Sequence, residues 1–173
     1  MDNLGLFFLV FNLGGKNNFL DSVMIFGSEY LIYIVFALIF FLGLKGSIKE
    51  KKALILIVFA LPIAVLIIKT IHLFIIEPRP FVAYNFIPLA DPTDNASFPS
   101  RHTTIISTIA FGYALYKSKL TSFMLLFLVW IGLSRVYIGV HYPIDILGGA
   151  GVGLISLFTA KKFLKSIRIK FFS

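Results

Sequence analysis

The sequence predicts an all-α protein, a polytopic transmembrane bundle of five or six membrane-spanning helices with short loops, forming a single domain over residues 1–173. Composition is the first reason: 58% of the residues are hydrophobic and only 14% are charged, whereas a soluble domain carries about 25% charged residues. The second reason is that the apolar residues gather in runs close to the roughly 20 residues that a helix needs to cross a bilayer. Five such runs occupy residues 30–44 (extended upstream), 53–76, 100–116, 120–139 and 143–160.

A further apolar stretch, residues 4–13, is too short to cross a membrane alone. It ends at a turn-like cluster of glycine, lysine and asparagine residues. Two interpretations stay open: a helix that lies at the membrane interface, or one half of a hairpin completed by residues 19–26. The expected number of crossings is therefore five or six.

Lysine clusters between the apolar runs are the third reason, and they predict the orientation. If the runs alternate in direction, all clusters fall on one side, which the positive-inside rule makes cytoplasmic. The clusters are Lys45, Lys49, Lys51 and Lys52; Lys117 and Lys119; and Lys161, Lys162, Lys165, Arg168 and Lys170. Membrane topology thus explains the net charge of +8, and no nucleic-acid partner is expected. We expect a multi-pass protein of the cytoplasmic (inner) membrane that acts as a monomer.

The opposite face, toward the periplasm or exterior, is where the remaining charged residues gather. The loop over residues 77–99 holds five of the seven prolines, too many for a helix interior, and residues 91–95 within it are typical of turns. Charges at membrane depth are costly and indicate function. Arg79, Arg101 and Arg135 meet at this face with few nearby carboxylates, which predicts an anionic ligand. A phosphate matches the guanidinium fork.

Ser100 directly precedes an apolar helical run, so it is a candidate N-cap whose helix offers free N–H groups to an anion. An ordinary cap without a ligand would be the simpler interpretation of a lone serine. Arg101 and His102 follow it at the membrane boundary, however, and this combination favours an anion site.

His141 and Asp145 flank Pro143, a candidate first residue of the last helix. A carboxylate in this position can fix the tautomer of the imidazole and leave its other nitrogen to attack or to transfer a proton. The alternative is an interfacial histidine bonded to a helix-capping aspartate, and for this pair alone the two interpretations are equally good.

Lys69 and His72 lie on a similar face of one helix, and both are expected to point into the bundle. Arg79 and Arg135, taken singly, fit side chains that snorkel to lipid headgroups. For the small residues over 148–153, close helix packing is the interpretation that we prefer.

Together these residues resemble the three-part signature of the type 2 phosphatidic acid phosphatase superfamily. Its pattern is a lysine, six residues and Arg-Pro; then Pro-Ser-Gly-His; then Ser-Arg, five residues, His, three residues and Asp. The third part is complete between Ser134 and Asp145. The second reads Pro99-Ser100-Arg101-His102, with arginine in place of glycine.

The first part ends at Arg79-Pro80, but His72 occupies the position of its lysine, and the nearest lysine is Lys69. Three possibilities stay open: Lys69 reaches the phosphate, His72 takes over this contact, or the contact is absent. Arg101 either adds a phosphate contact or reaches a second acidic group of the substrate. The motifs lie within residues 69–145.

The resemblance implies a membrane lipid phosphatase that works through a phosphohistidine. It implies that His141 is the nucleophile, that Asp145 orients it, and that His102 is the general acid and then the general base. It assigns the phosphate-binding role to Arg79, Ser100 and Arg135. The resemblance requires no metal and no cofactor, and neither is expected here.

The expected partners are the bilayer and a lipid phosphate at headgroup depth. Candidate substrates are lipid A 1-phosphate, phosphatidylglycerophosphate and undecaprenyl diphosphate. Two alternatives remain: a non-enzymatic anion transporter lined by the arginines, and a relative of the vanadate-dependent haloperoxidases.

Overall fold

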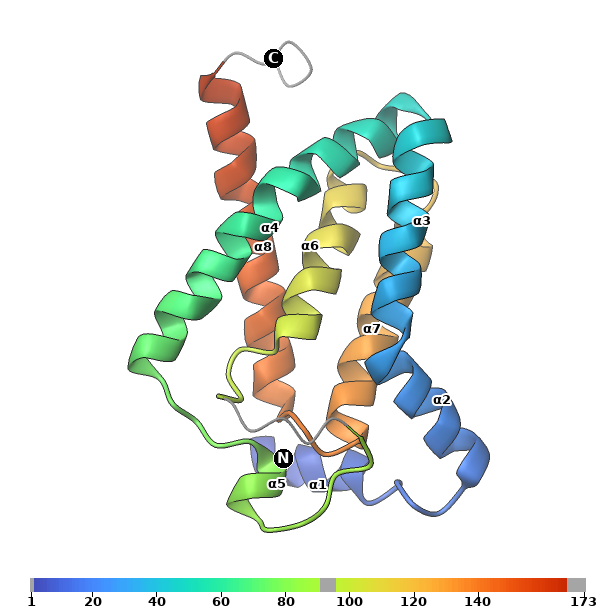
Figure 1. Ribbon diagram of the computed structural model, residues 1–173, viewed down its shortest axis with the longest axis vertical. Coiled ribbons are helices and arrows are strands. Elements are labelled where there is room, and N and C mark those ends of the chain that lie inside the picture. The colour runs from blue at the N-terminus through green and yellow to red at the C-terminus, as the bar shows by residue number, and fades with distance from the viewer. Residues whose placement is uncertain (1, 91–95, 168–173) are drawn as a thin grey trace.

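The computed structural model describes residues 2–90 and 96–167 (Figure 1). Over these residues it is all-helical, without a strand, which confirms the all-α part of the predicted fold class. The turns expected over residues 91–95 lie outside the described residues. The helices are α1 (Asn3–Phe11), α2 (Asn18–Glu29), α3 (Leu31–Lys45), α4 (Ile48–Phe74), α5 (Pro80–Ala83), α6 (Arg101–Leu115), α7 (Thr121–Tyr137) and α8 (Pro143–Ser166).

Helix α6 lies at the centre of the bundle, where it packs against α4, α7 and α8 (Figure 1). Ile106, Ile109 and Tyr113 of α6 are fully buried and join an apolar core with residues of α3, α4 and α7. Because lipid tails are as apolar as these side chains, dispersion contacts between closely fitted groups are what favours packing in this interior. The most enclosed helix is thus the one whose first turn carries the second motif.

Helices α6 and α8 approach each other closely because two glycines of α8 face α6. A Cβ added at Gly149 would lie 2.7 Å from the carbonyl oxygen of Ser100, and one at Gly153 would lie 2.9 Å from the amide nitrogen of Thr108. The expectation that small residues allow close packing is confirmed at these two positions. Gly151, by contrast, faces open space.

Helices α2 and α3 are nearly continuous, but they bend by 52° between Glu29 and Leu31. Helix α1 lies across the ends of α7 and α8 (Figure 1). Its Leu6 and Val10 line an apolar groove together with Val136 of α7 and Pro143 of α8. This arrangement fits the first of the two interpretations of residues 4–13, a helix lying across the bundle. Residues 19–26 belong to α2 and do not form a hairpin with α1.

Two helices, α4 with 27 residues and α8 with 24, are long and apolar enough to cross a membrane. The bent pair of α2 and α3 makes a third if it counts as one span. Helices α6 and α7, with 15 and 17 residues, are shorter. Length and composition thus identify two or three spans in the described residues, and five or six crossings stay a prediction.

The turn between α3 and α4, the loop between α6 and α7 and the end of α8 carry the lysine clusters, and all three lie at one end of the bundle, drawn at the top of Figure 1 and called the lysine end below. There the Lys49 ammonium donates a hydrogen bond to the Lys117 carbonyl oxygen, 3.2 Å away. The loop after α4, helices α1 and α5, and the first turns of α6 and α8 lie at the opposite end, called the site end. Arg168 and Lys170 lie outside the described residues.

Candidate active site

His141 lies in the short connection between α7 and α8. Its backbone N–H donates to the carbonyl oxygen of Arg135, 3.3 Å away, so the last turn of α7 supports it. Pro143 is the first residue of α8, as predicted, and Asp145 lies in the same first turn. The Tyr142 amide donates to Asp145 Oδ2 at 2.8 Å and thereby closes this helix end.

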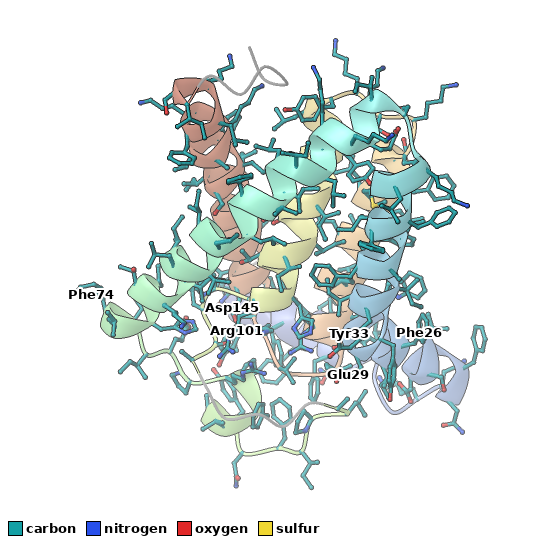
Figure 2. All side chains as sticks on the ribbon, turned by 45° about the horizontal axis from the view of Figure 1, so that its top comes forward. Phe26, Glu29, Tyr33, Phe74, Arg101 and Asp145 are labelled. Carbon is teal, nitrogen blue, oxygen red and sulfur yellow. The ribbon has the colours of Figure 1, made fainter. Side chains whose placement is uncertain are left out.

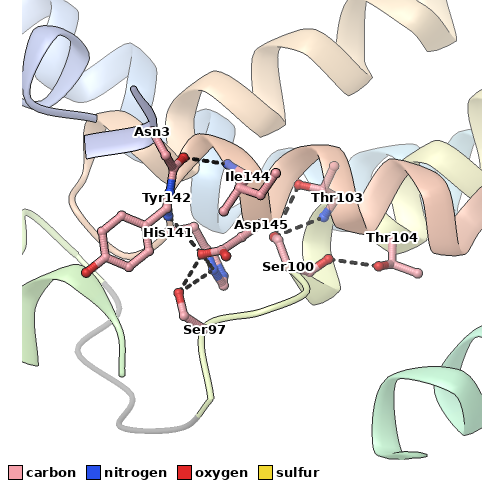
Figure 3. Close-up of polar contacts among 9 residues, drawn as sticks. All are labelled: Asn3, Ser97, Ser100, Thr103, Thr104, His141, Tyr142, Ile144 and Asp145. Atoms are coloured by element: carbon pink, nitrogen blue, oxygen red, sulfur yellow. Dashed lines mark hydrogen bonds and ion pairs between the residues drawn. The ribbon is translucent and has the colours of Figure 1, made fainter. Parts of the chain in front are cut away.

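The predicted contact between His141 and Asp145 is present, with 3.3 Å between His141 Nδ1 and Asp145 Oδ2 (Figure 3). Ser97 joins the pair: its hydroxyl donates to Asp145 Oδ2 at 2.5 Å and lies 3.5 Å from His141 Nδ1. His141 is 2% exposed, whereas Asp145 and Ser97 are completely buried. Asp145 Oδ1 is buried without a hydrogen-bond partner in the described part of the chain. The carboxylate therefore holds a histidine and a hydroxyl through one of its oxygens.

Ser100 is the N-cap of α6, as predicted. Its hydroxyl accepts weak hydrogen bonds from the Thr103 amide, 3.4 Å away, and from the Thr103 hydroxyl, 3.1 Å away. Its own N–H donates to the Asp145 carbonyl oxygen at 3.1 Å, which fixes the second motif to the third. His102 is the second residue of α6 and is half-buried.

Arg79 directly precedes α5, whose first residue is Pro80, and is 5% exposed. It lies within electrostatic reach of both Asp145 and His72. The first motif thus supplies a buried guanidinium whose charge acts on both the histidine–aspartate pair and His72 of α4.

Arg135, which is 1% exposed, has partners that the sequence did not reveal. Its Nη1 donates to the Ser28 hydroxyl at 2.8 Å and to Glu29 Oε1 at 3.3 Å, at the bend between α2 and α3. The expectation that the arginines lack nearby carboxylates is therefore wrong for Arg135. Figure 2 shows Glu29 on the side of the site opposite Phe74, with Arg101 and Asp145 between them in this view.

Lys69, His72 and Arg101 line one cavity of about 230 Å³ between α4 and α6. The expectation that Lys69 and His72 point into the bundle agrees with the buried Nε2 of His72, whereas Lys69, like Arg101, is exposed although it lines the cavity. Its remaining lining is mainly apolar, from residues 61–68 of α4 and from Ile105 of α6.

Glu77 adds a carboxyl group beside the site, in the loop after α4. Burial, and secondarily the negative charge of Asp145, raise the pKa of the Glu77 carboxyl. Its carbonyl oxygen accepts a hydrogen bond from the Ser97 amide at 2.8 Å, so the loop that holds Glu77 also positions Ser97.

Ser97 and Glu29 are the residues of the site that sequence reasoning missed. Ser97 lies two residues before the Pro-Ser pair, among turn-forming residues, and nothing in its neighbourhood distinguishes it from a loop serine. Glu29 gave a usable signal, since it is a charged residue at the end of an apolar helix.

The site suits transfer of an anionic group. A buried carboxylate orients a histidine, and several cations lie at the same end of the bundle. No group of three or more histidine, cysteine or acidic side chains in the described residues is placed to hold a metal ion.

Comparison with known proteins agrees with these motifs. The sequence profile of the PAP2 superfamily matches residues 53–168. The undecaprenyl-diphosphatase BcrC of Bacillus subtilis (strain 168) is 34% identical over 167 residues, which cover 96% of this chain and 86% of BcrC. YbjG, a candidate undecaprenyl-diphosphatase of Escherichia coli (strain K12), is 36% identical over 164 residues, covering 92% and 81%.

Among solved structures, the crystal structure of Aquifex aeolicus LpxE matches with a TM-score of 0.72 and 29% identity. The match covers 92% of this chain and 94% of LpxE. Apolar helices and membrane-protein relatives agree on an integral membrane protein. The profile spans most of the helical bundle and includes both His141 and Asp145, so this chain belongs to the PAP2 superfamily. Together with the two relatives above, this makes it a phosphatase of the PAP2 type.

Proposed function

We propose that the protein hydrolyses a phosphate group from a membrane lipid through a phosphohistidine on His141. The observation that carries this proposal is the buried arrangement in which Asp145 Oδ2 lies 3.3 Å from His141 Nδ1. Because Nδ1 faces the carboxylate, Nε2 is the nitrogen that attacks phosphorus. Asp145 stabilises the positive imidazole ring that forms in this step.

The reaction has two steps. First, His141 Nε2 forms a bond to phosphorus while the bond from phosphorus to the leaving oxygen breaks, and His102 donates a proton to that oxygen. Second, His102 accepts a proton from water while the water oxygen forms a bond to phosphorus. The bond from phosphorus to His141 Nε2 breaks, its electron pair returns to the ring, and inorganic phosphate leaves. His141 and His102 then return to their starting protonation states.

Arg79, Arg135 and the Ser100 region hold the phosphoryl oxygens and stabilise their charge in the transition state. Glu29 supports this role because it holds the guanidinium of Arg135 in one orientation. A salt bridge that buries an arginine is costly to assemble, so its presence at the motif fits a positioning role for Glu29.

The position of the site at the ends of apolar helices supports a lipid substrate, because helix ends of a membrane protein are expected near the depth of headgroups. Undecaprenyl diphosphate is the first candidate, since two relatives that align over more than four fifths of their own length carry that activity in their names. Lipid A 1-phosphate and phosphatidylglycerophosphate are the other candidates. The reaction requires no metal.

The proposed topology has five or six crossings of the cytoplasmic membrane. The lysine end faces the cytoplasm by the positive-inside rule, so the site end faces the periplasm or exterior. We propose a monomer as the active unit.

A phosphate-release assay tests the activity. Purified protein in detergent micelles is given each of the three lipids, with EDTA present throughout. We expect release of inorganic phosphate and an acid-labile, base-stable phosphoenzyme during turnover. Absence of release from all three lipids, together with phosphate uptake into proteoliposomes, would favour the anion transporter instead.

Cysteine labelling tests the sidedness, because the chain contains no cysteine. Ile87 at the site end is 92% exposed, and Lys119 at the lysine end is also exposed. An impermeant thiol reagent added to intact spheroplasts should label Ile87→Cys and spare Lys119→Cys until the membrane is permeabilised. The reverse pattern would move the chemistry to the cytoplasmic leaflet.

A further inference from the structure

The two positions at which this chain departs from its family's motifs lie side by side in space. His72 stands where the first motif has lysine, and Arg101 stands where the second has glycine. They are 29 positions apart in the sequence (101 − 72), yet both line the 230 Å³ cavity between α4 and α6. Lys69 lines the same cavity, so three basic side chains surround one space.

Within the described residues no carboxylate pairs with these three side chains, although the His72 ring is hydrogen-bonded to the backbone of Phe98. Neither Lys69 nor Arg101 forms an ion pair within the described residues. His72 Nε2 is buried and has no hydrogen-bond partner there. Like charges in one place are unfavourable unless an anion joins them, and a buried nitrogen without a partner costs free energy that a ligand oxygen would recover.

Arg79 defines how this cluster relates to the reacting centre. It lies within electrostatic reach of Asp145 and of His72. Arg101 also directly follows Ser100, whose N–H donates to the Asp145 carbonyl oxygen at 3.1 Å, so the basic cluster is adjacent to the histidine–aspartate pair. Two phosphate groups joined by one oxygen would suit this arrangement, with Arg79 near both.

We infer that Lys69, His72 and Arg101 form a subsite for a second phosphate group and adapt this phosphatase to lipid diphosphates. This inference rests on the proposed function. The terminal phosphoryl group lies at His141, and the inner phosphate, which stays on the lipid, lies in the basic cavity. The apolar residues of the cavity, including Ile68 and Ile105, contact the first carbons of the lipid chain.

The subsite stabilises the leaving group. When His141 Nε2 bonds to the terminal phosphorus, the bond from that phosphorus to the bridging oxygen breaks. The electron pair stays on this oxygen, which becomes part of the lipid monophosphate. Cations around the inner phosphate stabilise the negative charge that it gains, and a lipid monophosphate substrate draws no such benefit from them.

The test compares a polyprenyl diphosphate with phosphatidic acid as substrates of the full-length protein in mixed micelles. Arg101→Gly restores the family residue, and Lys69→Met removes a second cation. Each should lower the ratio of kcat/KM for the diphosphate to kcat/KM for phosphatidic acid by about tenfold or more, as expected for loss of a charge-assisted contact. Lys16→Met is the matched control, since Lys16 is an exposed lysine in the loop between α1 and α2, and it should preserve the ratio.

Inhibition by inorganic anions gives an independent readout. Pyrophosphate should inhibit hydrolysis of phosphatidic acid by the wild type more strongly than orthophosphate does, and Arg101→Gly should remove this advantage. Equal losses on both substrates in the Arg101 and Lys69 variants would overturn the subsite and assign the cluster to the reacting phosphoryl group. A wild type that hydrolyses neither of these lipids, nor lipid A 1-phosphate or phosphatidylglycerophosphate, would refute the proposed function itself, which is a distinguishable result.

Discussion

Glu50 and Asp145 are two buried carboxylates at opposite ends of the same bundle, with exposures of 7% and 0%. Glu50, at the lysine end, accepts a hydrogen bond from the Ser118 hydroxyl at one oxygen and from the Ser47 hydroxyl at the other. Asp145, at the site end, receives the Ser97 hydroxyl, the Tyr142 amide and the His141 ring all at Oδ2. Hydroxyl groups therefore support both carboxylates, but only one is joined to a titratable ring.

The difference teaches which buried charge is structural and which is chemical. Both oxygens of Glu50 are engaged by serines that belong to the turns before α4 and α7, so the carboxylate ties these two turns together. Asp145 Oδ1 has no hydrogen-bond partner in the described residues, whereas its Oδ2 contacts His141 and positions the ring. A buried charge with an incompletely satisfied environment is costly, and such a cost is commonly retained at functional sites.

Removing one partner from each carboxylate should give the largest contrast. His141→Ala removes the nucleophile, so phosphate release should fall by several orders of magnitude while the detergent-solubilised protein stays folded. Ser118→Ala removes a donor from Glu50, so it should lower the thermal midpoint and leave turnover per folded molecule intact. Phosphate release and a thermal shift are measured on both. More than about a tenth of wild-type turnover in His141→Ala would contradict the assignment of the nucleophile.

Neutralising the carboxylates themselves should give the next largest effect. Asp145→Asn keeps the shape but cannot stabilise a positive imidazole, so turnover should fall by roughly 10²- to 10⁴-fold. Glu50→Gln should change turnover by less than about threefold, since it only weakens hydrogen bonds to two serines. The two variants are compared by initial rates at saturating substrate. Equal losses in both would show that burial, rather than contact with His141, is what makes a carboxylate matter here.

The sequence predicts the local parts of the site end well, because their signals lie within one turn. Ser100 as N-cap, Pro143 as first helical residue and the His141–Asp145 contact all follow from spacing. Helix α4 begins earlier than the apolar run that predicted it, at Ile48 rather than residue 53. The reason is that Ser47 and Glu50 form a serine-x-x-glutamate start that apolar patterning alone overlooks.

Contacts between distant segments could not be predicted in this way. Ser97 reaches Asp145 only because the loop after α4 folds back over α8, and Glu29 reaches Arg135 because α2 bends away from α3. That bend lies at Tyr30, a residue without the special backbone preferences of proline or glycine. Close packing of α2 on α7 accompanies it, since a Cβ at Gly27 would lie 2.5 Å from Trp130 Nε1.

Removing a serine hydroxyl that donates to each carboxylate should have a smaller effect on turnover. Ser97→Ala removes the 2.5 Å hydrogen bond to Asp145, and turnover should fall by about 5- to 30-fold, equivalent to roughly 1–2 kcal/mol. Ser47→Ala is the counterpart at the lysine end and should leave turnover unchanged. Because a positioning role acts on the ring, Ser97→Ala should also shift the pH–rate profile. Unchanged turnover and an unchanged profile would reduce Ser97 to a packing residue.

Glu77 provides the smallest test, because its carboxyl lies near Asp145 but forms no hydrogen bond within the described residues. Burial and the charge of Asp145 raise its pKa in the folded protein, so folding favours the protonated form. The stability that this preference contributes is fully present below the unfolded-state pKa and is lost as pH rises through the folded-state pKa. Glu77→Gln remains neutral throughout, so the variant and the wild type should have the same thermal midpoint at low pH.

Above the raised pKa the Glu77→Gln variant should be more stable than the wild type, by less than about 1 kcal/mol, since Glu77 is partly exposed. Thermal unfolding of both proteins in one detergent, measured from acidic to neutral pH, checks the sign. A variant that is less stable than the wild type at neutral pH would mean that the charged form of Glu77 has a favourable partner. Hydrogen bonds from hydroxyl groups would then not be the feature that separates Glu50 and Asp145 from Glu77.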